Sequence, residues 1–344
     1  MNGNDIQQRS SGIQAELGKP AFRWDRREWL LLAVVILLAL LFGLTNPHFL
    51  TVENLLNILN QSTIILLVSL GMLAVIVSGG IDLSVGALAS LVGVVTVVMM
   101  NDLGIPAYAA ILLGLVTGGF VGLLNGFSVS RLKIPDFIST LAMMSICRGA
   151  AFLISGGYAV RTEDRLLVSL YNEKLGPLTL PIVVTAAAAI LMFLFLGRTR
   201  PGRSMYAVGG NRHAALLMGI HVQRTVLLSY SICGFLTAAG GILTASRIAA
   251  GSPTAGMGWE LTAISIVVLG GASLFGGQGG VLGTVLAAIL LGMINNWLSL
   301  TGMAWWLQGF VQGALLILVV ALNRRILSEK LSSWRSGMPA SGER

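Results

Sequence analysis

Ten apolar runs of similar length follow one another along the chain, with short polar segments between them. A transmembrane helix needs ~20 mostly apolar residues, so each run predicts one membrane-spanning helix. The runs lie near 29–45, 57–77, 84–101, 107–130, 138–155, 181–197, 226–248, 260–276, 281–299 and 304–323. The pattern predicts an all-α polytopic membrane protein with about ten transmembrane helices.

Composition supports this interpretation and excludes a soluble domain. The chain has 344 residues, of which 55% are hydrophobic and only 10% are charged, whereas soluble domains carry about 25% charged residues. We expect a polar cytoplasmic tail over 1–28, one transmembrane domain over 29–325 and a second tail over 326–344. The domain divides into halves, 29–197 and 226–323, that are joined by a polar segment, 198–225.

The basic residues indicate the orientation of the chain. Of 22 Lys and Arg, 17 lie in the N-terminal tail, around residues 131–133, in the segment 198–225 and after residue 323. Cytoplasmic loops are enriched in Lys and Arg, and these four segments fall on one side when ten spans are counted. Both termini are therefore expected in the cytoplasm. This distribution is a topology signal, not a basic groove with stacking aromatics, so no nucleic-acid partner is expected.

The polar segment 198–225 carries five arginines and no Asp or Glu. Asn211 is expected to cap a helix over 212–218, and Gly219 to end it in the left-handed conformation. Apolar residues recur at helical spacing there: Ala214, Ala215, Leu217 and Met218. A two-turn helix is unstable alone, so this one needs a partner surface, either lipid headgroups or a protein groove.

Short stretches of the two halves are weakly similar in sequence. Residues 80–84 read GIDLS and residues 258–262 read GWELT; likewise, GLLNG at 122–126 resembles GMINN at 292–296. The span count places the first acid at the inner membrane face and the second at the outer face, as an inverted-topology repeat would. Glycine clusters around 79–80, 270–271 and 276–280 are expected to break helices where backbone is buried or lines a cavity.

Three ionisable residues near the spans carry functional hypotheses, because charges in a membrane are costly. Asp82 is either a helix N-cap or part of a gate. Arg148 lies about 15 Å into its span at 1.5 Å per residue. It either pairs with Glu260 near the outer gate or extends to the outer headgroups. The polar residues of the spans either line a path or hydrogen-bond between helices; they are Ser84, Asn125, Asn295 and Asn296.

Catalytic and cofactor-binding patterns do not occur in the sequence. Cys147 and Cys233 lie in apolar runs and are expected as free buried thiols. The three histidines have no metal-ligand spacing, so no metal and no cofactor are expected. The glycine-rich residues 276–284 lack the Gly-Lys-Ser/Thr of a phosphate-binding loop. The chain is therefore expected to be a transport subunit and not an enzyme, with any ATP hydrolysis in a separate subunit.

Three stretches together carry a family resemblance. SGGIDLSVGALASLVG (78–93), GRSMYAVGGNRHAALLMGI (202–220) and PTAGMGWELTAISIVVLGGASLFGGQGGVLGT (253–284) resemble the ribose/arabinose/xylose-type permease subunits of bacterial ATP-binding-cassette importers. The resemblance extends from about residue 29 to 325. Branched-chain amino-acid permeases are more distant, since GIDLS fits the sugar branch better.

The resemblance implies a bacterial inner-membrane protein with a type II-like permease fold. It implies three partners: a cytoplasmic ATPase, a periplasmic sugar-binding protein and a second permease copy, as a homodimer or a heterodimer. It also implies that residues 203–219 form the segment that couples to the ATPase. The residues expected there are Arg203, Gly210, Asn211, Ala214, Ala215, Leu217, Met218 and Gly219.

Two alternatives stay open. An ion-coupled secondary transporter would also be built of inverted repeats, and would need a relay from Asp82, Arg148 and Glu260. A permease for a non-sugar solute, such as a branched-chain amino acid, is the other. The permease sequence does not specify which sugar is carried.

Overall fold

The computed structural model describes residues 26–303, 307, 309–310 and 313–314. This part of the chain contains seven helices that are long and apolar enough to cross a bilayer. They are α2 (Arg26–Thr45), α3 (Val52–Val77), α5 (Ala107–Ser130), α6 (Asp136–Ser155), α8 (Leu180–Arg198), α11 (Val222–Ile248) and α13 (Val281–Leu300). Most of the expected span 304–323, and most of both tails, lies outside the described residues.

Two further apolar helices are short. The helix α4 (Val85–Asn101) has 17 residues, and α12 (Trp259–Leu269) has only 11. The expected span over 260–276 is therefore wrong at its end, because Gly270 and Gly271 turn the chain and Gly271 has φ 95°. Residues 270–280 then run without regular structure to the start of α13.

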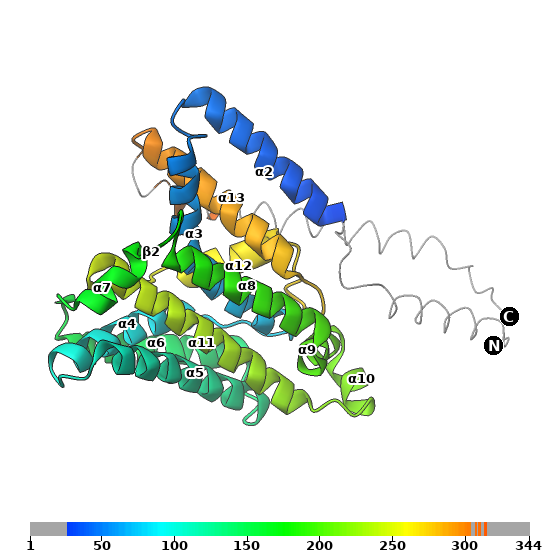
Figure 1. Cartoon of the computed structure of the whole chain (residues 1–344). Helices are drawn as coiled ribbons and strands as arrows, with labels where there is room; N and C mark the ends of the chain where they lie inside the picture. The colour runs from blue at the N-terminus through cyan, green and yellow to red at the C-terminus, as the bar shows by residue number, and fades with distance from the viewer. Residues whose placement is uncertain (1–25, 304–306, 308, 311–312, 315–344) are drawn as a thin grey trace.

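The helices α3 and α11 form the centre of the bundle. The helix α3 packs against α11, α12 and α13, while α11 packs against α3, α4 and α5. The helices differ in burial: in the most apolar stretch of α3, 83% of the residues are buried, whereas in that of α2 only 11% are buried. Figure 1 shows α2, in blue, lying along α13 at the edge of the bundle. Exposed leucines on α2 and α8, such as Leu37 and Leu191, are suited to face lipid.

The chain between α11 and α12 enters the protein interior. The strand β4 (Ala250–Gly251) pairs antiparallel with β1 (Val160–Arg161). The chain then follows α4, so that Gly251 lies against Val94 and Gly256 against Gly86. Gly86 and Val94 are eight residues apart on α4, so the segment follows this helix for about 12 Å. We call residues 250–258 the re-entrant segment. Non-helical backbone at such depth is tolerated when protein surrounds it, and the sequence did not predict it.

The two ends of the bundle differ. One end carries the amphipathic helix α7 (Arg165–Asn172), whose N-cap Asp164 accepts a hydrogen bond from Leu167 N at 2.9 Å. A hairpin of β2 (Lys174–Leu175) and β3 (Leu178–Thr179) follows. The helices α9 (Arg200–Gly210) and α10 (Arg212–Leu217) lie at the other end (Figure 1). We call this second end the coupling end, because it carries the residues 203–219 that are expected from the sequence to couple to an ATPase.

A buried pair of asparagines joins α3 to α13. Asn54 Nδ2 donates to Asn296 Oδ1 at 2.9 Å, and Asn296 Nδ2 donates to Asn54 Oδ1 at 2.9 Å. Both side chains are buried. Asn296 therefore hydrogen-bonds between helices, which favours that alternative over path lining.

Replacing Asn296 with Ala leaves Asn54 Oδ1 without its donor, while Asn54 Nδ2 keeps its bond to Phe49 O at 2.8 Å. We expect Asn296→Ala to lower the free energy of unfolding by about 1 kcal/mol, the scale of interhelical hydrogen bonds in membranes. Equilibrium unfolding in mixed detergent measures this change. The double variant Asn54→Leu, Asn296→Leu should lose less than the sum of its single variants, since neither partner is then left unpaired. Strict additivity would contradict the interpretation.

Candidate functional site

At the coupling end, α9 follows α8 after a sharp change of direction. Thr199 caps it, because its Oγ1 accepts a hydrogen bond from Gly202 N at 3.1 Å, and Pro201 occupies the first turn. The helix continues through Gly210. Burial of Met205 and Val208 against the bundle keeps this glycine-containing stretch helical.

The helix α10 forms as the sequence predicts, to within one residue. The Oδ1 of Asn211 accepts from Ala214 N at 3.0 Å, and Gly219 follows the helix with φ 77°. Ala215 is buried, whereas Leu217 and Met218 are 76% and 82% exposed. The other expected coupling residues, Arg203, Gly210 and Ala214, are also exposed. The tip of α10 thus presents apolar side chains that no described residue covers.

Three backbone segments meet where α9 ends. A Cβ on Gly209 would collide with the carbonyl oxygen of Val77 and lie 2.6 Å from Gly277 N. Gly277 N donates to Val77 O at 2.9 Å, while Gly276 and Gly277 have φ values of 87° and 73°. Only glycine suits both the contact and the left-handed conformation. We call Val77, Gly79, Gly209, Gly276 and Gly277 the glycine junction.

Tyr206 forms a hydrogen bond beside the glycine junction. Its hydroxyl donates to Gly279 O at 3.0 Å. Burial, with a smaller effect of the Glu28 carboxylate, raises the pKa of Tyr206 to about 12. The hydroxyl therefore keeps its proton, and its role as a donor, at physiological pH.

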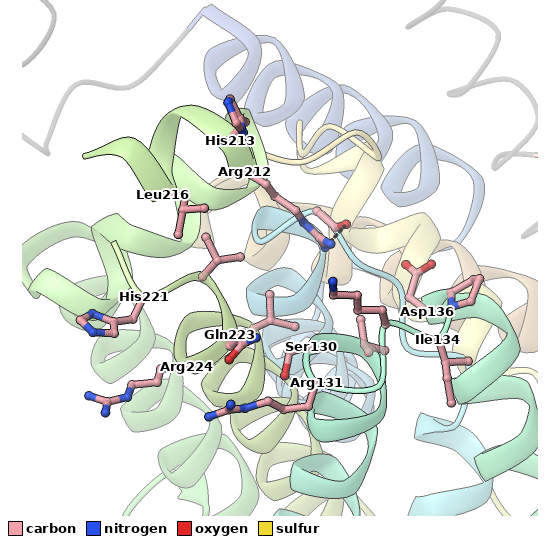
Figure 2. Close-up of a pocket in the computed structure, with 16 residues that line it drawn as sticks. Ser130, Arg131, Ile134, Asp136, Arg212, His213, Leu216, His221, Gln223 and Arg224 are labelled. Carbon is pink, nitrogen blue, oxygen red and sulfur yellow. Dashed lines mark hydrogen bonds between the residues drawn. The ribbon is translucent and has the colours of Figure 1, made fainter. Parts of the chain in front are cut away.

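A cavity of about 960 Å³ opens beside α10 (Figure 2). Arg212 extends from α10 toward it, and its Nη2 donates to Gly79 O at 3.3 Å. The end of α5, the loop between α5 and α6, the first residue of α6 and the start of α11 supply most of the remaining lining. We call this space the basic cavity, since Arg131, Lys133 and Arg224 also line it.

Asp82 is the centre of a buried hydrogen-bond cluster. Its Oδ1 accepts from Ser84 N at 2.9 Å and from Ser84 Oγ at 2.6 Å. Asn125 Nδ2, from α5, lies 3.3 Å from Asp82 Oδ2 and donates to Ser84 Oγ at 2.9 Å. Asp82 does not occupy the N-cap of α4, which is Ser84. Ser84 and Asn125 therefore bond between segments, and this favours the structural alternative over path lining.

Arg148 attaches the re-entrant segment to α4. Its Nη1 donates to Pro253 O at 2.7 Å, to Ala255 O at 3.2 Å and to Ser90 Oγ at 2.9 Å. Ser90 Oγ also hydrogen-bonds to Ala255 O. The expected extension of Arg148 to the outer headgroups is therefore not what the structure shows, because its guanidinium binds internal carbonyls. Sequence reasoning missed these partners, since backbone carbonyls leave no signature in a sequence.

Glu260 is near Arg148 but is not bonded to it. Both residues line a cavity of about 450 Å³, and Glu260 Oε2 is buried without a hydrogen-bond partner among the described residues. The carboxylate lies against Gly86, in the first turn of α4. Glu260 is therefore deeper than the outer face at which the sequence placed it, because the re-entrant segment carries the start of α12 inward.

Asn295 differs from its neighbour Asn296. It lines a second cavity, of about 920 Å³, between α3, α11, α12 and α13, together with Gln61 and Trp259. Its Oδ1 is buried and has no partner among the described residues. Asn295 therefore lines a cavity, which agrees with the path-lining alternative of the sequence analysis.

Residues 54–320 match the family described as "Branched-chain amino acid transport system / permease component". The chain belongs to this permease family. The permease is 36% identical over 313 residues to the ribose import permease protein RbsC of Escherichia coli K12, covering 88% of this chain and 97% of that protein. It is 34% identical to the D-allose transport system permease protein AlsC over 308 residues, with 89% and 94% covered.

A further relative is the L-arabinose transport system permease protein AraH of Escherichia coli K12. It is 36% identical over 301 residues, covering 88% of the permease and 91% of the relative. No solved structure matches the permease at a significant level. These findings confirm the expected resemblance to the sugar branch of importer permeases.

The close packing of the glycine junction predicts that a Cβ at Gly209 destabilises the permease. We expect Gly209→Ala to lower the free energy of unfolding by about 1–3 kcal/mol, the usual cost of overpacking. Gly210→Ala is the matched control, because a Cβ there meets nothing within 4 Å. Thermal unfolding of the purified permease compares the two variants. Equal unfolding midpoints would show that the junction is not closely packed.

Proposed function

We propose that the chain is the membrane-spanning subunit of an ATP-driven importer that passes a monosaccharide into the cytoplasm. The similarity that covers 97% of a ribose import permease supports this most strongly. Under this proposal a periplasmic binding protein delivers the sugar and a cytoplasmic ATPase supplies the energy. The ribose, allose and arabinose relatives are similarly close, at 34–36% identity, so the proposal names the class of sugar only.

The exposed tip of α10 is proposed to seat in the ATPase. Leu217 and Met218 are largely exposed, and α10 is too short to be stable without its neighbours. Gly209 lies against Val77 at the end of α3 and against the loop of Gly277. A displacement of α9 and α10 on ATP binding would therefore reach α3 and the start of α13 without passing through flexible side chains.

The packing of the two halves supports an inverted repeat. A long helix, α3, leads through residues 78–84 to the short α4, and the long α11 leads through the re-entrant segment to the short α12. Each short helix packs against the long helix of the other half, α4 on α11 and α12 on α3. Transporters of this kind place their path at the repeat interface, near interrupted helices. We place the path beside the Arg148–Glu260 cavity.

Orientation and assembly complete the proposal. The coupling end faces the cytoplasm, both termini lie there, and two permease copies enclose the path. Four basic residues line the cavity at this end: Arg131, Lys133, Arg212 and Arg224. Their presence agrees with the enrichment of cytoplasmic loops in Lys and Arg.

Reconstituted vesicles test the energy source. We expect radiolabelled pentose uptake only when the permease, its ATPase, the binding protein and ATP are all present. The Oε2 of Glu260, which is buried with no hydrogen-bond partner among the described residues, is the feature that favours an ion-coupled transporter instead. Uptake by the permease alone, driven by a proton or sodium gradient, would establish that alternative.

The role of α10 is tested by making its tip polar. We expect Leu217→Ser, Met218→Ser to reduce ATP-dependent uptake by about tenfold or more, since two exposed interface anchors contribute a few kcal/mol. Copurification of the ATPase should fall in parallel. Tyr158→Ser is the control, because Tyr158 is 81% exposed in the loop after α6, away from α10. Undiminished copurification with the α10 variant would rule out this contact.

Arg148 and Glu260 are tested by a double-mutant cycle. Glu260→Gln and Arg148→Gln should each reduce uptake, because each alters a shared cavity wall, and the double variant should lose less than the product of the two losses. Because Arg148 also holds the re-entrant segment, Arg148→Gln should lower the unfolding midpoint and Glu260→Gln should not. Losses of uptake that multiply independently would count against a functional pair.

A further inference from the structure

The basic cavity has an amphipathic lining. Its positively charged members come from three segments: Arg131 and Lys133 between α5 and α6, Arg212 on α10, and Arg224 on α11. Apolar side chains form much of the remaining wall, and they are Val129, Ile134, Leu216, Val222 and Val226. Figure 2 shows Arg131 and Arg224 extending toward the same edge of the cavity and Arg212 pointing across it.

The positive charge of this cavity is not neutralised from within. Asp136 is the one acid among the lining residues, and its Oδ2 already accepts a hydrogen bond from Ile81 N at 2.8 Å. The side chains of Arg131, Lys133 and Arg224 bond to no described residue. Several uncompensated cations around one hollow attract an anion, and arginines bind phosphate oxygens with well-defined geometry.

The loop that carries two of these cations is held in an uncommon conformation. Lys133 has φ 55°, although it is not a glycine. The left-handed conformation is unfavourable for a residue with a Cβ, and such residues concentrate at ligand clamps. The loop therefore presents Lys133 at a conformational cost.

Apolar side chains around the cavity indicate contact with lipid. Leu132, in the loop between α5 and α6, is 59% exposed, and Phe137, at the start of α6, is 52% exposed. Phe127 on α5 is 43% exposed. Basic residues interleaved with exposed Phe and Leu are typical of the headgroup level of a membrane. Leu217 and Met218, the proposed ATPase contacts, do not line this cavity. The cavity therefore adjoins the proposed coupling surface and shares α10 with it, but the two side chains proposed to contact the ATPase are not part of its wall.

We propose that the basic cavity binds an anionic phospholipid, such as phosphatidylglycerol. Its phosphate would lie among Arg131, Lys133 and Arg224, and an acyl chain would follow the apolar wall. A free phosphate shares the headgroup chemistry but would leave that wall unused. Basic pockets between helices at a membrane surface bind anionic headgroups in this way. The proposal goes beyond sugar import and depends on neither the solute nor the ATPase.

Lipid titrations of the purified full-length permease test the proposal. Native mass spectrometry of bound lipid should show phosphatidylglycerol binding more tightly than phosphatidylcholine. Each basic residue near a membrane surface contributes about fivefold in affinity for anionic lipid. Arg131→Gln, Arg224→Gln should therefore weaken phosphatidylglycerol binding roughly 25-fold, and Arg131→Lys, Arg224→Lys should retain most of it.

Arg165→Gln, Lys174→Gln is the matched control, because it removes two exposed charges near α7, at the other end of the bundle. It should change the affinity less than about twofold, since distant surface charges are screened. An unchanged unfolding midpoint in phosphatidylcholine shows that a variant is folded. Equal binding of the two lipids, an equal loss in the control, or displacement of the lipid by millimolar inorganic phosphate would each overturn the proposal.

Discussion

The backbone contact between Val77, Gly209 and Gly277 is the constraint on which the coupling end depends. Side chains can absorb small displacements by changing rotamers, but no side chain stands between these three segments. The end of α9 is therefore fixed directly to the end of α3 and to the loop before α13. Since α3 lies at the centre of the bundle, a movement of α9 such as the one proposed would reach this buried helix directly.

A second fixed point lies deeper in the bundle. The guanidinium of Arg148 satisfies two carbonyls of the re-entrant segment and holds it along α4. Non-helical backbone within a membrane protein needs such partners, because unsatisfied carbonyls are costly there. The same segment positions Glu260 at the wall of a cavity. One arginine thus stabilises the irregular backbone and helps to form the cavity wall that the proposed path would follow.

Local features were predictable from the sequence, and long-range contacts were not. The cap at Asn211 and the left-handed Gly219 follow from the chemistry of adjacent residues, so α10 was placed to within one residue. Long apolar runs located the seven long helices, because the hydropathy of a segment is read from its own residues and does not depend on tertiary contacts. Membership of the permease family was also recognisable, since its motifs are contiguous stretches.

The failures have a common physical cause. The bonds of Arg148 reach carbonyls more than 100 positions away, and any residue carries a carbonyl. Glu260 was placed too far outward because a span count assumes that each loop stays at the surface. Asn295 and Asn296 are adjacent and chemically identical, yet helical rotation turns one toward Asn54 and the other toward a cavity.

The lengths of the two central helices carry a consequence for the surrounding bilayer. With 26 and 27 residues, α3 and α11 are each about 40 Å long at 1.5 Å per residue, whereas a hydrocarbon core is about 30 Å thick. The polar first turns of these helices, with Glu53 on α3 and Arg224 on α11, can extend beyond that core, and the remaining hydrophobic mismatch is relieved by tilting or by local thickening of the lipid. The inclination of the central helices, and with it the geometry of everything packed on them, is therefore sensitive to the thickness of the host membrane.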